Sequence, residues 1–210
     1  MSRAAVIFKC LVVTLVVSLP LAMVPAASWA ASGGSSGAGS SSTTCTAPVV
    51  SEVYSWAQDT NLYAPLPGER WDSMGNGSGW TLSGGAKFET TTVADGKKGT
   101  VLDMPSGSKA ISPSVCVTNT YPASRTEIRD VSGSMGVNIA VAYMGTAGWG
   151  ATQTSGSVTG IGAGWTLPSA FDMKPSNVTG WQLARFTVTA QGASSEYQLS
   201  NFYVDPRMHK

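Results

Sequence analysis

The sequence predicts an all-β protein built as an antiparallel β-sandwich, and three observations support this prediction. The chain holds 24 Gly and 11 Pro residues, spread so widely that no amphipathic helix of useful length fits between them. Apolar residues instead alternate with polar ones at a spacing of two, as on strands with one buried face. About ten such stretches are separated by turn signals such as Ser83-Gly84-Gly85, a pattern typical of sandwiches.

The clearest strand is predicted at 137–143, where apolar residues occupy every second position. The same alternation marks 184–190. A third run, 196–205, ends before Pro206, which cannot donate to a strand ladder. Shorter strands are expected at 69–73, 80–83, 87–93, 100–104, 115–118, 126–131 and 165–171.

The first 30 residues have the features of a secretory signal peptide. Arg3 and Lys9 give a basic start, and residues 10–24 form an apolar, uncharged stretch. Ser28-Trp29-Ala30 then offers a small-residue cleavage site. A retained membrane anchor is the alternative, because the apolar stretch approaches the length of a bilayer span. We expect cleavage, and therefore a secreted, extracellular protein with no membrane contact once the signal is removed.

Residues 31–44 contain only Gly, Ser, Ala and Thr, a composition that predicts a flexible linker. A single β-sandwich domain is expected over residues 45–206, followed by a short tail at 207–210. The formal net charge is +1, and no basic cluster exists beyond Lys97-Lys98, so nucleic acid is not an expected partner. The sequence leaves the oligomeric state open.

The cysteine content predicts one disulfide. Cys10 lies in the signal, which leaves Cys45 and Cys116, and an even number of cysteines in an exported chain indicates a disulfide. Two free thiols or a metal-binding pair are the alternative, although His209 is the only other soft ligand. We therefore expect a Cys45–Cys116 disulfide, with no catalytic metal and no cofactor.

Three stretches of the chain carry a resemblance: 67–72 (PGERWD), 79–86 (GWTLSGGA) and 198–206 (QLSNFYVDP). They resemble the opening and closing strands of galactose-binding-like β-sandwiches, a group that includes many carbohydrate-binding modules. The layout is similar to a family of secreted actinobacterial proteins with this predicted fold. The resemblance implies a jelly-roll sandwich over the whole domain. It implies less about function, because this fold hosts binding, structural and catalytic proteins alike.

The resemblance also raises the question of calcium. In such modules an acidic residue of the opening strand and an Asp of the closing strand often hold a structural calcium ion. Here Asp72 keeps a carboxylate, whereas Ser200-Asn201 stand where two aspartates would be. Asn201 offers an amide oxygen that calcium accepts, but the lost charge weakens the site. We expect the domain to fold without metal.

Catalytic chemistry finds little support in the residue types present. A Ser-His-Asp or Cys-His hydrolase needs a base inside the domain, and the single histidine, His209, lies in the tail. Glycoside hydrolysis needs only two carboxylates, and the sequence leaves open which ones converge. Glu127 and Arg129 share a face of an expected strand, which predicts a surface charge pair. We expect no enzymatic activity.

Aromatic residues give the strongest indication of function, because sugar rings stack on Trp and Tyr while polar neighbours bond the hydroxyls. Trp80 falls on an expected strand and is assigned to the core. Trp149 lies between two glycines in an expected loop, Trp165 follows a Gly-rich stretch, and Tyr143 ends a strand. We therefore predict a secreted, non-catalytic module that binds polysaccharide or a cell-surface glycan through Trp149, Trp165 and Tyr143. The alternative is a structural protein of the cell envelope whose aromatic residues only pack the core; Trp149 and Trp165 on one face would favour binding.

Overall fold

The computed structural model describes residue 45 and residues 48–69, 74–120, 122–173 and 181–207. The predicted signal, the linker and residues 208–210 lie outside the described residues, as do Asp72 and most of the predicted strand 69–73. In chain order the elements are β1 Ser51–Glu52, η1 Ser55–Ala57, β2 Leu62–Pro65, β3 Thr81–Ser83, β4 Lys87–Thr92, β5 Lys98–Pro105, β6 Lys109–Ile111, β7 Val115–Thr118, β8 Ala123–Ser132, β9 Val137–Gly145, β10 Gly148–Trp149, β11 Gln153–Val158, β12 Phe171–Asp172, β13 Trp181–Ala190 and β14 Glu196–Arg207. No helix in the described ranges is long and apolar enough to cross a membrane.

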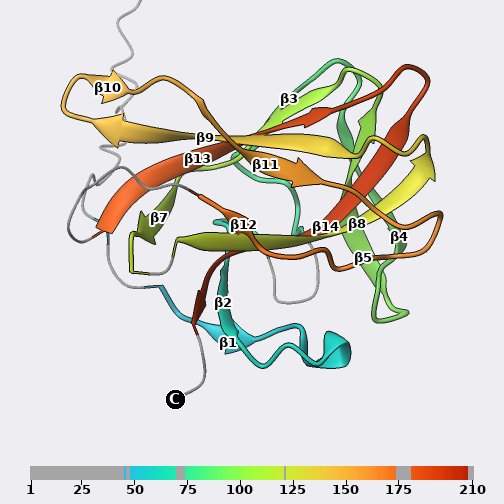
Figure 1. The fold of residues 1–210 in the computed structure, drawn as a ribbon, viewed down its shortest axis with the longest axis horizontal. Helices are drawn as coiled ribbons and strands as arrows, with labels where there is room; N and C mark the ends of the chain where they lie inside the picture. The colour runs from blue at the N-terminus through green and yellow to red at the C-terminus, as the bar shows by residue number, and fades with distance from the viewer. Residues whose placement is uncertain (1–44, 46–47, 70–73, 121, 174–180, 208–210) are drawn as a thin grey trace, which may run out of the picture. The chain divides into compact units, whose positions relative to one another are not determined.

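The strands form two antiparallel sheets, which confirms the predicted all-β sandwich (Figure 1). The first sheet has the order β1-β2-β14-β5-β4, with β8 on the other side of β14 and β12 beyond β8. The second sheet has the order β10-β9-β13-β6-β3, with β11 also paired to β9 and β7 also paired to β13. The last strand, β14, therefore lies inside the first sheet, with partners on both of its edges.

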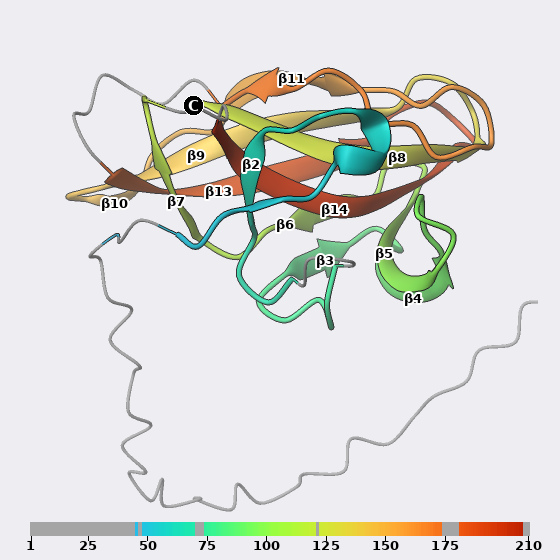
Figure 2. The same ribbon diagram turned by 90° about the horizontal axis from the view of Figure 1, so that it is seen from below.

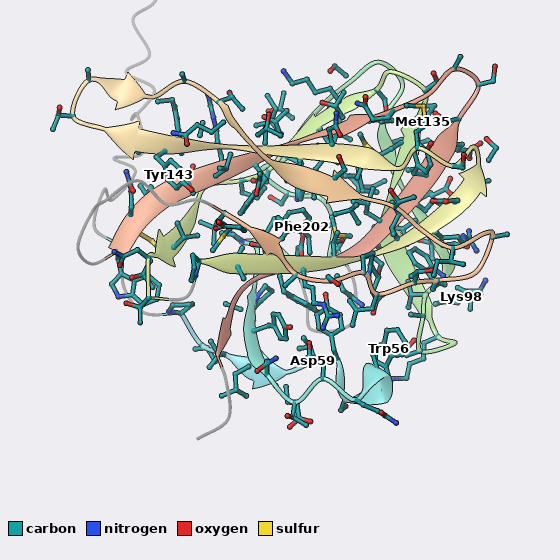
Figure 3. All side chains as sticks on the ribbon, viewed as in Figure 1. Trp56, Asp59, Lys98, Met135, Tyr143 and Phe202 are labelled. Atoms are coloured by element: carbon teal, nitrogen blue, oxygen red, sulfur yellow. A yellow bond between two sulfur atoms is a disulfide. The ribbon has the colours of Figure 1, made fainter. Side chains whose placement is uncertain are left out.

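The main hydrophobic core lies between the two sheets. Successive side chains of a strand point to opposite faces, and in β13 Ala184, Phe186 and Val188 are buried while the residues between them are half-buried. Phe202 of β14 lies near the centre of the core (Figure 3). Its ring centroid is 5.0 Å from that of Phe186 and 5.7 Å from that of Phe171. Both sheets thus contribute aromatic rings to one core.

A smaller aromatic cluster lies on the outer face of the first sheet, which is the face turned away from the second sheet. Tyr54 and Tyr63 pack against Tyr203 of β14, with ring centroids 5.5 Å and 6.4 Å from it. Arg125 of β8 forms an ion pair with Asp59 beside this cluster. The N-terminal segment of η1, β1 and β2, cyan in Figure 1, therefore covers one end of this face.

The Cys45–Cys116 disulfide predicted from the sequence is present and is thereby confirmed. The two Cα atoms lie 5.5 Å apart, and the bond joins residues separated by 71 positions in the chain. It fixes the start of the folded domain to β7.

The predicted strand at 165–171 is wrong. This segment makes a single bridge, between Thr166 and Ile128 of β8, before β12 begins at Phe171. Pro168 lies between them and has no N–H to offer a ladder, so the strand cannot continue. Conversely, β11 was not predicted, because its residues (QTSGSV) are mostly polar and carry no apolar alternation.

Candidate functional site

A row of polar side chains crosses the outer face of the first sheet. Lys87 of β4 pairs with Asp103 of β5. Gln198 of β14 pairs with Asp103 on one side and with Arg129 of β8 on the other. The residues on either side of Gln198 in β14 are buried in the core, so these side chains point away from it. We call Lys87, Asp103, Gln198 and Arg129 the polar row.

Ion pairs and hydrogen bonds connect the polar row to Glu89 of β4. The Lys87 Nζ atom lies 3.2 Å from Oε2 of Glu89 and 3.6 Å from Oδ2 of Asp103. The Gln198 amide donates to Glu89 and, at 3.4 Å, to Asp103, and the Arg129 guanidinium donates to Gln198. Asp103 and Gln198 are buried, whereas the side chains of Lys87 and Glu89 are 60% and 33% exposed. The buried members therefore hold the exposed ones in position.

Glu127 of β8 lies in the next row of the same face and is only 1% exposed. It stands opposite Ser200 of β14, and its Oε2 accepts a 3.0 Å hydrogen bond from the Asn201 amide. Among the described residues, Oε1 of Glu127, the Ser200 hydroxyl and Nε of Arg129 are buried without a hydrogen-bond partner. Unpaired buried polar atoms are uncommon, and three on adjacent strands of one face indicate a place for ordered water.

Burial raises the pKa of Glu127 from 4.5 to about 7, and the charge of Asp95 in the β4–β5 turn adds to the rise. The hydrogen bond from Asn201 opposes the rise. The side chains of Trp56 and Ser200 also lower the pKa of Glu127. Neither side chain donates a hydrogen bond to Oε1 of Glu127, which has no partner. Near neutral pH this carboxyl is present in both protonation states, so it can donate as well as accept a hydrogen bond.

Trp165 lies beside Arg129 at one end of the polar row and joins the two flanks of the first sheet. The Arg129 guanidinium carbon is 5.3 Å from the centroid of its ring. Its Nε1 donates a 2.8 Å hydrogen bond to the carbonyl oxygen of Thr92, the last residue of β4. The next residue, Thr166, exchanges backbone hydrogen bonds with Ile128 of β8. The Trp165–Thr92 contact, which we call the Trp165 bridge, therefore reaches from the β8 side to β4 across β14 and β5.

Trp56 of η1 is a second indole on this face. Trp56 is 47% exposed, and its side chain interacts with the Glu127 carboxyl. Figure 3 places Trp56 close to Asp59 of the N-terminal segment and far from Tyr143. Two indoles, Trp165 and Trp56, therefore contact the part of the outer face that carries the polar row and Glu127, which we call the polar face.

The structure separates the three aromatic residues that the sequence assigned to a ligand. Trp149 does not lie in a loop but in β10, which pairs with β9, and the Arg185 guanidinium carbon is 4.4 Å from its ring centroid. This pair lies on the outer face of the second sheet. Tyr143 is buried and donates to the carbonyl of Met173 inside the sandwich. Trp149 and Trp165 therefore do not share a face, and a ligand contact at Tyr143 stays a prediction with no exposed surface to support it.

The predicted surface charge pair of Glu127 and Arg129 is not formed. Both residues face the same side, but Glu127 is buried and bonded to Asn201, while Arg129 bonds to Gln198. The Trp165 bridge and the N-terminal segment cover this part of the face. The sequence around Glu127 and Arg129 does not predict this burial, because the covering residues lie far away in the chain. Sequence reasoning also missed Gln198 and Ser200, which the alternation in 196–205 places on the polar side of the strand.

The described residues contain no group of three His, Cys, Asp or Glu side chains that could hold a metal ion. Asn201, which the resemblance linked to calcium, bonds to Glu127 and accepts a 3.5 Å hydrogen bond from Tyr203 instead. A turn of the β14 backbone accounts for this orientation: the strand register shifts here, and Asn201 has a φ of 52°.

No family model and no curated protein matches this chain significantly. Among solved structures, the chain is similar to the CBM22-1 xylan-binding domain of Xyn10C from Paenibacillus barcinonensis, with 17% identity over 63% of this chain and 88% of that chain and a TM-score of 0.42. It is also similar to the family 11 carbohydrate-binding module of the cellulosomal cellulase Lic26A-Cel5E from Clostridium thermocellum, with 10% identity over 78% of this chain and 99% of that chain and a TM-score of 0.42. A third similar structure is TmCBM61 in complex with β-1,4-galactotriose, with 16% identity over 63% of this chain and 91% of that chain and a TM-score of 0.36. With TM-scores this low, these similarities carry no information about a shared site.

Proposed function

We propose that the protein is a secreted, non-catalytic module that binds carbohydrate through the outer face of its first sheet. The observation that carries the proposal is the polar row: buried Gln198 holds the half-buried Glu89 and Arg129 in place, and Arg129 lies against the Trp165 ring. A sugar is complementary to such a set, because its hydroxyls both donate and accept while its C–H face stacks on an aromatic ring.

Each half-buried or exposed side chain of the site offers a sugar hydroxyl a definite partner. Lys87 and Arg129 donate, and Glu89 accepts. Because ion pairs and hydrogen bonds already hold these side chains, binding a ligand immobilises little that is free beforehand. The unpaired atoms of Glu127 and Ser200 lie in the adjacent, covered row and give ordered water a place to bond.

The arrangement favours binding over catalysis. Glu127 has the raised pKa that a general acid needs, but its side chain is 1% exposed, so it does not reach a glycosidic oxygen resting on the polar row. Secretion is supported by the signal-like start of the sequence and by the Cys45–Cys116 disulfide, a bond typical of oxidising compartments.

A structural protein of the cell envelope is the second candidate. Its favouring observation is that the side chains of the polar row are bonded to one another, as a network that only stabilises the sheet would be. Binding to a glycan separates the two candidates.

A glycan array and affinity electrophoresis in soluble polysaccharides test the proposal on the purified protein. Two Arg–Trp stacks supply matched variants: Arg129→Ala removes the stack on the first sheet, and Arg185→Ala the one on the second. We expect wild type and Arg185→Ala to bind alike. Arg129→Ala should lose about 1.5–3 kcal/mol of binding free energy, roughly tenfold or more in affinity.

If Arg185→Ala loses binding and Arg129→Ala does not, the ligand binds the outer face of the second sheet, beside Trp149. A wild-type protein that binds no glycan would favour the structural role.

A further inference from the structure

We propose that the polar face accepts the end of a glycan chain and not its interior, because the Trp165 bridge closes the face on one side of the polar row. The inference rests on the proposed carbohydrate binding and adds which part of a glycan is recognised. Trp165 is then the residue that determines this specificity.

The burial of outward-facing residues shows that the face is covered beside the row. Val101 of β5, Ser200 of β14 and Glu127 of β8 all point away from the core, yet none is more than 1% exposed. Side chains of these kinds on an open sheet face would be in contact with solvent. Figure 2 shows that β4 and β5 curl strongly, and the turn between them lies near enough for Asp95 to act on Glu127.

The bridge itself is anchored at both ends. On the β4 side, the carbonyl of Thr92 accepts the 2.8 Å hydrogen bond from Nε1 of Trp165. On the β8 side, Thr166 exchanges backbone hydrogen bonds with Ile128, and Gly160, earlier in the same segment, donates its N–H to the Asp130 carboxylate at 3.2 Å. A Cβ at residue 160 would lie 2.6 Å from Oδ1 of Asp130, so only glycine allows this approach. A sugar chain that continued from the polar row toward Glu127 would have to break the Trp165–Thr92 contact.

The opposite side of the row stays open. Lys87, which lies in the row itself, keeps 60% of its side-chain surface exposed. Glu196, on the side of Gln198 away from Ser200, is half-buried. A glycan therefore approaches over Glu196 and stops at Trp165, where its last ring meets the indole. Because the polar row is open on the Glu196 side and closed on the Glu127 side, it recognises the terminal sugar of a chain.

The dependence of the binding capacity on the number of polysaccharide chain ends tests this inference. Purified protein is depleted from suspensions of insoluble xylan, mannan, galactan and mixed-linkage glucan, each intact and after limited acid hydrolysis, with reducing ends counted chemically. We expect the binding capacity per gram to rise in the same proportion as the chain ends. A capacity that stays constant while the ends multiply overturns the chain-end inference alone. Absence of binding to every polysaccharide and to the oligosaccharides released from them overturns the proposed function as well.

Trp165→Phe provides the matched variant, because phenylalanine keeps a ring against Arg129 but has no N–H for Thr92. We expect this variant to bind intact polysaccharide with a higher capacity than wild type, since the closed side opens. Trp149→Phe, on the second sheet, should behave like wild type. If Trp165→Phe shows the wild-type dependence on chain ends, the bridge is not the barrier and the assignment to Trp165 is wrong.

Discussion

The guanidinium carbon of Arg129 lies 5.3 Å from the ring centroid of Trp165, and this contact ends a row of polar side chains that spans four strands. A similar stack on the second sheet, Arg185 over Trp149, has different neighbours. Arg129 stands opposite Gln198 and bonds to it, whereas Arg185 stands opposite Ala142 of β9. Only the first stack therefore belongs to a polar network, which is why we place the ligand there.

Glu127→Gln is expected to remove a pH-dependent loss of stability. Burial raises the pKa of Glu127 to about 7, so the wild type loses stability as the pH rises from about 4.5 through 7 and the buried carboxyl ionises. The full shift corresponds to roughly 3 kcal/mol. In denaturant melts the two proteins should differ little near the lower pH, and the variant should gain on wild type as the pH rises. A difference in unfolding free energy that does not change with pH would contradict the raised pKa.

Asp59→Asn should loosen the N-terminal segment from the first sheet. Burial alone would raise the pKa of Asp59, but hydrogen bonds from Tyr63 and Arg125 hold it below its usual value, so the ionised form stabilises the fold. We expect a loss of about 2 kcal/mol or more in the free energy of unfolding, because Arg125 keeps a half-buried charge without its partner. The control is Asp95→Asn, whose pair with Lys97 is exposed and should contribute less than about 0.5 kcal/mol. Equal effects would mean that the Asp59–Arg125 pair does not hold the segment.

The disulfide should account for much of the stability of the domain. Replacing Cys45 and Cys116 by serine removes a bond between residues 71 positions apart in the chain. In the chain-entropy model, this costs about 4 kcal/mol of unfolding free energy. Denaturant melts of the double variant measure this loss. In the wild type, peptides containing Cys45 or Cys116 should resist alkylation until the protein is reduced. Labelling of either cysteine without reduction would show that the bond is not formed.

Strands whose pattern is local could be predicted from the sequence. The alternations at 137–143 and 184–190 correspond to β9 and β13, because burial of one sheet face imposes a period of two on consecutive residues. The candidate site could not be predicted in this way. The Trp165 bridge depends on a contact with Thr92, 73 positions earlier in the chain, and the polar row depends on the register of four strands. Such pairings are not encoded in any short stretch.

Trp80 and Trp149 should respond very differently to truncation. Trp80 packs against the main core, with its ring centroid 6.1 Å from that of Phe88 and 6.4 Å from that of Phe202. We expect Trp80→Ala to cost about 3 kcal/mol of unfolding free energy. Trp149 is half-buried and its ring contacts Arg185, so Trp149→Ala should cost about 0.5–1 kcal/mol. Comparable losses in denaturant melts would mean that Trp149 is as structural as Trp80.

An NMR titration locates the ligand on one of the two faces. The isotope-labelled protein is titrated with oligosaccharides from the polysaccharide that it retains in affinity electrophoresis, and the indole and side-chain N–H signals are followed. We expect the largest shifts at the Trp165 indole N–H, which now bonds to Thr92, and at the side chains of Arg129 and Gln198. Signals of Trp149 and Arg185 should stay in place. Shifts that gather at Trp149 and Arg185, with Trp165 unmoved, would contradict the assignment of the outer face of the first sheet as the carbohydrate site.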